Sequence, residues 1–269
     1  MKPVFFARLT AIMLVALTFA CSDHADPTAA KTFVLVHGAW QAPYAWQVVK
    51  NQLVQQGQNV IVVELPGHGA DQTAPATLTI DVYRDKVIGA INAVPGNVIL
   101  VGHSMGGMVV TATAEKIPAR VEKLVYIGAF LPANGQSLLA LASTDSSSLL
   151  GPSLVPSADQ LTLDIKPQAI VPIFIQDGSD EIKKQVIDNY RAEPAIPFTN
   201  PVTVTAANFG QVRKYYIHTI QDQAVGFNLQ KRMVAAAGVK TTYTLNTSHC
   251  PFLSMPDQVT SLLLTISRL

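Results

Sequence analysis

The segment Gly102–Gly106 reads GHSMG and places Ser104 in the pattern G-x-S-x-G. It directly follows the apolar run Val98–Val101 and directly precedes Met108–Glu115, whose residues suit a helix. A strand, a tight turn and a helix in this order form a nucleophile elbow, in which a strained turn presents the serine hydroxyl. We therefore predict that Ser104 is a nucleophile, rather than part of an ordinary glycine turn.

A serine hydroxyl becomes an effective nucleophile only when a base takes its proton. Of the six histidines, His249 follows the last strand-like run, Thr242–Leu245, and precedes the C-terminal helical pattern. That loop lies at the carboxyl end of the sheet near the elbow, so we predict His249 as the base. The other five lie in the N-terminal tether, in glycine-containing turns or within a strand: His24, His37, His68, His103 and His218.

The third group must be a carboxylate that orients the imidazole and stabilises its cation. In the chain order serine, acid, histidine, it comes after a late strand and before His249. Asp222 follows the run Lys214–His218 and leaves room for one helix and one strand before His249, so we predict Asp222. Asp177 and Asp180 are its rivals, which we expect to be turn residues.

Acyl transfer also needs two backbone N–H donors for the oxyanion, and removal of one comparable donor costs about 3–4 kcal/mol of barrier. The first is expected on Met105, directly after the nucleophile. The second is expected in the turn after the first apolar run, where His37–Trp40 reads HGAW. Gly38 lets the backbone turn so that the N–H of Ala39 faces Ser104.

These residues must be positioned by a common framework of strands. Continuously apolar runs are typical of strands buried on both faces of a parallel sheet. They alternate here with helical patterns, which predicts a doubly wound, mostly parallel α/β sheet. The strands are expected at residues 33–36, 60–63, 98–101 and 124–127, and then at 214–217 and 242–245.

Between about Leu131 and Val212 the alternation breaks, in a stretch with eight prolines and the serine-rich segment 143–148. We predict a cap insertion of short helices and loops within one domain over residues 32–269, not a second domain with its own sheet. Leucines are frequent in the first half of this insertion. They either line an apolar substrate pocket or pack the insertion onto the sheet.

Composition excludes several other classes of protein. With 269 residues, 49% hydrophobic and 14% charged, the chain is too apolar for a disordered protein. Its net charge of +1, without a basic cluster, argues against a nucleic-acid partner. Two cysteines, Cys21 and Cys250, are too few for a disulfide scaffold or a cysteine-rich zinc site. The predicted chemistry needs no metal and no cofactor, and we assign no role to Cys250.

At the N-terminus, two basic residues accompany the uncharged run Leu9–Ala20, which is too short to span a bilayer and suits a signal peptide. We predict a signal peptide over residues 1–20, export, and a polar tether over 21–31. The sequence before Cys21 is vaguely similar to a lipobox, although Thr18 stands where leucine is usual. A lipid on Cys21, tethering the chain to a membrane, is therefore left open.

Several motifs carry a resemblance that covers roughly residues 33–269. The chain contains VHGAW at 36–40, ELPGHG at 64–69, VGHSMGG at 101–107 and SHCPF at 248–252. Together they resemble the α/β-hydrolase superfamily. The run KYYIHT at 214–219 with Asp222 is similar to the branch of plant methylesterases, salicylate-binding proteins, hydroxynitrile lyases and bacterial pyrethroid-hydrolase-like carboxylesterases.

The resemblance implies an α/β-hydrolase fold with a cap over the site. It also implies a catalytic triad with two oxyanion donors: Ser104, Asp222 and His249, with Ala39 and Met105. Hydroxynitrile lyases carry a lysine after the catalytic histidine, where this chain has Cys250, so lyase activity is not expected. Haloalkane dehalogenases and most epoxide hydrolases carry an aspartate at the elbow, and Ser104 argues against both.

The sequence therefore predicts an exported serine hydrolase that cleaves carboxylic esters of small to medium apolar substrates through an acyl-enzyme. Two alternatives stay open. The same triad hydrolyses lactones, amides or carbon–carbon bonds when the pocket selects them, and a low-turnover ligand-binding protein can keep the triad on the same fold. The expected partner is a small-molecule ester, and the oligomeric state stays open.

Overall fold

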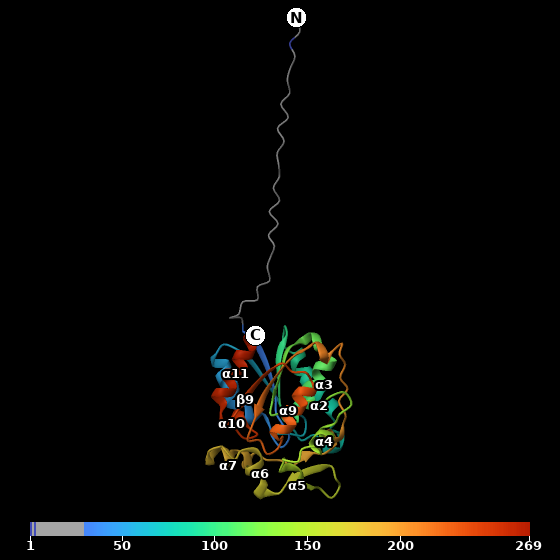
Figure 1. Ribbon diagram of the computed structural model, residues 1–269, viewed down its shortest axis with the longest axis vertical. Coiled ribbons are helices and arrows are strands. Elements are labelled where there is room, and N and C mark those ends of the chain that lie inside the picture. The colour runs from blue at the N-terminus through green and yellow to red at the C-terminus, as the bar shows by residue number, and fades with distance from the viewer. Residues whose placement is uncertain (2, 4–29) are drawn as a thin grey trace.

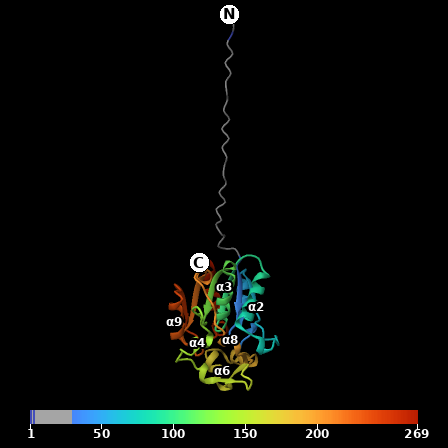
Figure 2. The same cartoon turned by 90° about the vertical axis from the view of Figure 1, so that its right-hand side faces the viewer.

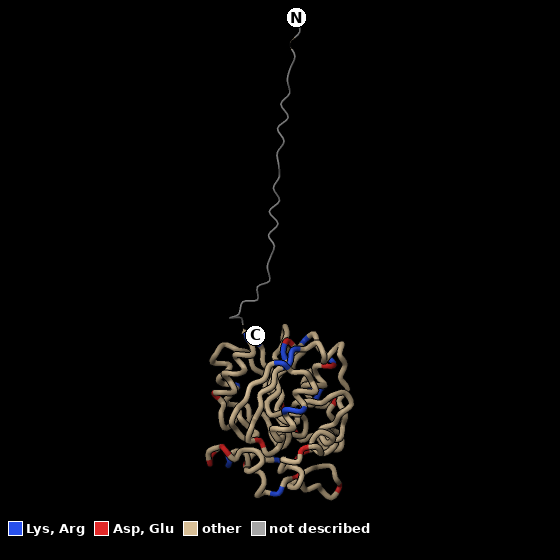
Figure 3. The backbone as a smooth tube through the Cα atoms, viewed as in Figure 1, with Lys and Arg blue, Asp and Glu red and all other residues tan. Residues whose placement is uncertain are grey.

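The computed structural model describes Met1, Pro3 and residues 30–269. Nearly all of the predicted signal peptide (1–20) and of the predicted tether (21–31), Cys21 included, lies outside the described residues. Among the described residues, no helix is long and apolar enough to cross a membrane. Acidic and basic residues are sparse and interspersed along the described chain (Figure 3).

Six parallel strands form the central sheet in the order β2-β1-β3-β4-β8-β9. Every position of β3 is buried, because helices cover both faces of the sheet and leave its central strands no contact with water. The predicted fold class is confirmed. The strands are β1 (Thr32–Val36), β2 (Asn59–Val63), β3 (Val98–His103), β4 (Val121–Ile127), β8 (Arg213–Thr219) and β9 (Thr241–Leu245).

The helices lie in two layers. α1 (Gln47–Gln55) and α11 (Pro256–Arg268) pack together on one side of the sheet, and α2 (Ile80–Asn92) and α3 (Gly106–Lys116) pack together on the other (Figure 1). The hydroxyl of Thr79 accepts from the N–H of Val82 and caps α2. The remaining elements of the sheet domain are η1 (Pro43–Trp46), η2 (Pro75–Thr77), η3 (Pro118–Arg120), α9 (Phe227–Ala236) and α10 (Pro251–Ser254).

Residues 131–212, called the cap segment from here on, contain short helices as predicted. α5, α6 and α7 lie together at the end of the molecule opposite the C-terminus (Figures 1 and 2). The helical elements are α4 (Leu138–Ala142), α5 (Leu150–Ser153), α6 (Pro167–Phe174), α7 (Asp180–Asp188), α8 (Ile196–Thr199) and the 3₁₀ turn η4 (Phe209–Gln211).

The prediction that the cap segment has no sheet of its own is wrong. β5 (Leu154–Pro156), β6 (Thr162–Ile165) and β7 (Glu193–Pro194) form a small antiparallel sheet in the order β5-β6-β7. Two of the eight prolines noted in this stretch, Pro156 and Pro194, lie within its strands. Both lie on edge strands, where a proline removes no hydrogen bond from the ladder.

The leucines of the cap segment divide by exposure. Leu138, Leu141 and Leu150 are buried in the common core, whereas Leu139 and Leu149 are exposed. The buried leucines therefore pack the cap segment against the rest of the molecule, which was one of the two interpretations left open by the sequence.

Candidate active site

The strand β3 leads into a tight turn at Ser104, which has φ of 51° and is 7% exposed. A non-glycine residue at positive φ is strained, and such strain concentrates at functional sites. Small neighbours permit the turn: a Cβ on Gly106 would lie 2.7 Å from the carbonyl oxygen of His37, and one on Gly107 would lie 2.1 Å from that of Phe130. The sequence GHSMGG thus folds as the strand, turn and helix that were predicted around Ser104.

The structure brings two of the three predicted triad residues into direct contact. His249 Nδ1 donates to Asp222 Oδ2 at 2.8 Å, and both side chains are buried. With its Nδ1 proton engaged, the neutral ring leaves Nε2 unprotonated to act as a base. Within residues 30–269 no hydrogen bond joins Ser104 to His249, a contact that is often long in enzymes without substrate.

Asp222 is held firmly in its orientation. Its Oδ1 accepts from the backbone N–H groups of Ala224 and Val225, both at 2.8 Å. Its Oδ2 accepts from the hydroxyl of Thr219 at 2.7 Å as well as from His249. The position of the carboxylate is therefore fixed before any charge develops on the imidazole.

The predicted oxyanion donors lie on two segments that converge on the elbow. A Cβ on Gly38 would lie 2.7 Å from Ser104 Cβ, so the turn after β1 passes directly against the serine. Ala39 and Met105 are buried, and among the hydrogen bonds of the described chain outside its helices and strands none uses the N–H of either residue. Buried N–H groups without a partner are rare, and two beside a serine suit an oxyanion.

His103, interpreted from the sequence only as a turn residue, contacts the predicted base. Its Nε2 donates to the backbone carbonyl of His249 at 2.9 Å. Burial, helped by the neighbouring His249, holds the pKa of His103 well below its usual range, so the ring stays neutral. The residue after Gly102 in the elbow motif thereby positions the loop that carries His249.

Of the two rival acids, Asp180 is exposed at the start of α7. Asp177, in the cap segment, accepts hydrogen bonds from the loop that carries His249. Asp177 Oδ2 accepts from the hydroxyl of Thr247 at 2.7 Å, the N–H of Ser248 at 3.0 Å and the hydroxyl of Ser254 at 3.1 Å. Its Oδ1 accepts from the hydroxyl of Ser248. Asp177 lies in a turn between α6 and α7, as predicted, and from there its contacts also position the loop that carries His249. The hydroxyls beside His249 were the only signal for it.

Replacing Asp177 by alanine is expected to lower kcat for an ester about 10- to 100-fold with little change in KM, because His249 loses its alignment. The free energy of unfolding should fall by about 1–3 kcal/mol, since Ser248 N–H is left buried without a partner. Asp177→Asn should restore kcat to within a few-fold, because the amide oxygen can replace Oδ2 and the amide nitrogen can donate to Ser248. Steady-state kinetics and urea unfolding measure both effects, with Asp180→Ala as the control. Equal kcat values for Asp177→Ala and Asp180→Ala would contradict the positioning role.

A second residue of the cap segment, Glu193, contacts the turn that carries Ala39 and forms a buried ion pair with His68. His68 Nε2 donates to Glu193 Oε2 at 2.8 Å, and the same oxygen accepts from the N–H of Trp40 at 2.7 Å. Burial would lower the pKa of His68, but the charge and hydrogen bond of Glu193 and the hydrogen bond to the carbonyl of Pro66 outweigh burial and raise it. Since Trp40 follows Ala39, this pair holds one side of the predicted oxyanion site.

Replacing Glu193 by glutamine is expected to lower the free energy of unfolding by about 1–3 kcal/mol near pH 6, because a charged hydrogen bond is lost. Since the folded pKa of His68 lies above its ordinary 6.5, its contribution is complete below that pH and is lost as the pH rises through the raised pKa. The gap between wild type and variant should therefore shrink from pH 6 to pH 9. Urea unfolding across this range measures it, with the exposed Asp188→Asn as the control. A gap that is constant with pH would show that His68 is not charged.

Cys250 adjoins His249 and is fully buried, with Gln41 Nε2 at 2.8 Å from its Sγ. Burial raises the pKa of its thiol well above the usual range, so it stays protonated. In the part of the chain that the structure describes, no group of three or more His, Cys, Asp or Glu side chains is placed to hold a metal ion. The predicted site offers a serine hydroxyl, an imidazole and a carboxylate for chemistry.

Several known proteins are similar in sequence to this chain. Putative methylesterase 14, chloroplastic, of Arabidopsis thaliana is 26% identical over 264 residues, which cover 92% of this chain and 75% of that protein. Other putative chloroplastic methylesterases of this plant are much longer than this chain. The region similar to putative methylesterase 13, for example, covers only 56% of that protein. The carbendazim hydrolyzing esterase of a Nocardioides strain is 40% identical over 114 residues, or 40% of this chain and 46% of that protein.

Two solved structures show the same fold. Polyneuridine aldehyde esterase superimposes with a TM-score of 0.79 at 23% identity, covering 89% of this chain and 100% of that one. A pyrethroid hydrolase from Sphingobium faniae gives a TM-score of 0.78 at 20% identity, covering 89% of this chain and 98% of that one. A sequence model described as the alpha/beta hydrolase family matches residues 33–262. The chain therefore belongs to the α/β-hydrolase family.

Proposed function

We propose that this chain is a carboxylesterase-type serine hydrolase acting on small to medium apolar esters. The observation that carries the proposal is the buried Asp222–His249 pair, together with the strained Ser104 and two unused backbone N–H groups. The carbonyl of His249 accepts from His103, the residue before Ser104. The similarity to proteins named as methylesterases and as a carbendazim hydrolyzing esterase supports an ester as the substrate.

The proposed reaction begins when Ser104 Oγ attacks the ester carbonyl and His249 Nε2 accepts its proton. The N–H groups of Ala39 and Met105 stabilise the oxyanion of the tetrahedral intermediate. Asp222 keeps the Nδ1 proton in place and stabilises the imidazolium that forms. His249 then protonates the leaving alcohol, and an acyl group remains on Ser104.

The second half of the reaction repeats these steps with water. His249 takes a proton from a water molecule, whose oxygen attacks the acyl carbonyl. The oxyanion again accepts from Ala39 and Met105, and the collapse of the second intermediate releases the acid and restores the Ser104 hydroxyl. No group outside these five residues is needed for the proton transfers.

A series of p-nitrophenyl esters from acetate to decanoate tests this function, combined with an alkyl phosphonate that traps activated serines. We expect ester turnover that rises to an optimum chain length, and a single phosphonate adduct that peptide mass spectrometry assigns to Ser104. Turnover of lactones or amides but not of esters would show that the same triad hydrolyses a different class of bond. No turnover, with tight binding of a product acid, would favour the low-turnover binding protein.

We further propose, from the sequence alone, that the chain is exported. If the segment before Cys21 acts as a lipobox, Cys21 carries the lipid. The mass of the N-terminal peptide from the producing cell distinguishes the outcomes. Cleavage after Ala20 supports export, a diacylglycerol on Cys21 supports the membrane tether, and an intact Met1 with residues 1–20 attached contradicts both.

A further inference from the structure

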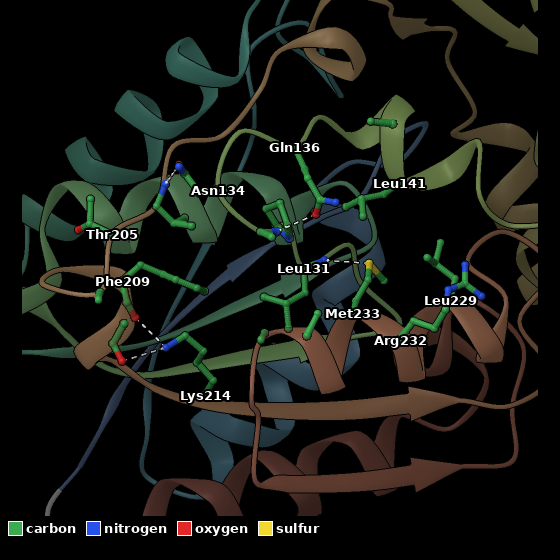
Figure 4. Close-up of a pocket in the computed structure, with 18 of the residues that line it drawn as sticks. Leu131, Asn134, Gln136, Leu141, Thr205, Phe209, Lys214, Leu229, Arg232 and Met233 are labelled. Carbon is green, nitrogen blue, oxygen red and sulfur yellow. Dashed lines mark hydrogen bonds between the residues drawn. The ribbon is translucent and has the colours of Figure 1, made fainter.

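A cavity of about 490 Å³ lies apart from the predicted active site, between the first part of the cap segment, the turn η4 and helix α9 (Figure 4). Ser104, Asp222 and His249 do not line it. Its volume falls within the range of sites that hold small molecules. The proposed esterase reaction makes no use of it.

The floor of this cavity is apolar. Gln136 and Leu141 lie on one side of it, and Leu229, Arg232 and Met233 lie on the other (Figure 4). Its buried apolar side chains come from four different segments: Leu131, Leu141, Phe209, Leu229 and Met233. An alkyl chain placed on this floor would be removed from water, which favours binding in proportion to the apolar surface buried.

The charged residues of the lining are both basic. Lys214 and Arg232 line the cavity together with no aspartate or glutamate, and neither forms an ion pair with any residue that the structure describes. Lys214 Nζ donates to the carbonyls of Phe209 at 2.7 Å and Val212 at 2.8 Å. The two basic side chains therefore favour a ligand of negative charge in this cavity.

Arg232 keeps donors available for a ligand. Its NH2 group donates to the carbonyl and the hydroxyl of Thr144, at 2.9 and 3.1 Å. Its other two guanidinium nitrogens have no hydrogen-bond partner within residues 30–269. A guanidinium with free N–H groups matches the two oxygens of a carboxylate.

The two amide side chains of the lining are oriented in the same sense. Gln136 Oε1 accepts from the N–H of Ala133 at 2.8 Å, and Asn134 Oδ1 accepts from the N–H of Val204 at 3.0 Å. The backbone thus occupies the acceptor end of each amide and leaves its NH₂ end as the available group. Arg232, Gln136 and Asn134 can all donate, so the lining favours a ligand that accepts hydrogen bonds and carries negative charge.

We propose that this cavity is a binding site for an amphipathic monocarboxylate with a medium-length alkyl chain. The alkyl chain lies on the floor of Leu131, Leu229 and Met233, and the carboxylate accepts from Arg232 and from the amide of Gln136. The inference goes beyond the proposed esterase function and does not rest on it, because it concerns a different cavity and needs no turnover.

Calorimetric titration of the whole protein with decanoate tests the site. To keep decanoate out of the catalytic centre, the same titration is repeated after Ser104 has been modified by the phosphonate. We expect one saturable site in the modified protein, with the same affinity as a site in the unmodified protein. Arg232→Gln should weaken binding about tenfold or more, because a charge-assisted hydrogen bond is lost. Decanol should bind weaker by a similar factor, since it lacks the charge.

Two further variants test whether decanoate binds in this cavity rather than elsewhere on the protein. Ala140→Trp places a large side chain in the lining and should abolish binding, whereas Lys240→Gln removes an exposed positive charge outside the lining and should leave the affinity unchanged. Circular dichroism checks that each variant folds. Absence of saturable binding, equal affinity for decanol, or an unchanged affinity in Arg232→Gln or Ala140→Trp each overturns the proposal. If Ser104 does not react with the phosphonate, the esterase proposal fails, but the variants still decide the cavity.

Discussion

Replacing Ser104 by alanine is expected to lower kcat for p-nitrophenyl esters by about 10⁴-fold or more, the size of loss seen when a serine nucleophile is removed from a comparable triad. The variant keeps the unused N–H groups of Ala39 and Met105 and the neighbouring cap contacts. A residual rate above that in water, attributable to these groups, should therefore remain. Active-site titration and steady-state kinetics on the same preparation measure the loss.

The control for Ser104→Ala is Ser157→Ala, which removes an equally small hydroxyl from an exposed turn of the cap segment. It should keep full activity and full phosphonate labelling. The double variant Ser104→Ala with His249→Ala should be hardly slower than Ser104→Ala alone, because members of a triad act as a unit. Additive losses, or turnover by Ser104→Ala within tenfold of wild type, would show that the ester is cleaved by another group.

The central sheet was predictable because strands buried on both faces are recognisable as continuous apolar runs in the sequence. Strands such as β1 and β3 contact helices on both faces, so nearly every residue is apolar, and the six runs were located to within a few residues. The small sheet of the cap segment has no such continuous apolar runs. Its strands have two to four residues, and Pro156 and Pro194 occupy edges where the usual penalty for proline does not apply.

The predicted site residues follow from local order along the chain, whereas the residues that hold them depend on contacts between distant segments. Ser104 stands at the end of a strand, and Asp222 and His249 follow the last two strands, so the topology alone directs them to one edge of the sheet. Asp177 and Glu193 reach that edge only because the cap segment folds back over it. Nothing in their immediate sequence distinguishes them from surface acids.

The contacts of Asp222 make the replacement by asparagine informative. Because Ala224 N–H and Val225 N–H both donate to Oδ1, that position must stay an oxygen. The amide nitrogen of the variant must then take the place of Oδ2, facing His249 Nδ1. A donor now meets a donor, and the imidazole avoids this conflict by moving its proton to Nε2, where it can no longer accept from Ser104.

We therefore expect Asp222→Asn to lower kcat by about 10³- to 10⁴-fold while the protein stays folded, since a comparable change of tautomer has that cost in a serine hydrolase. The proton resonance of His249 Nδ1–H should disappear from the low-field NMR spectrum, which reports the tautomer directly. The exposed Asp180→Asn is the matched control and should change neither. Activity within tenfold of wild type, with the Nδ1 proton still present, would mean that Asp222 does not set the tautomer. If the kcat loss and the missing resonance appear together, the loss lies in the tautomer of His249 rather than in packing, because both backbone contacts of Oδ1 survive the substitution.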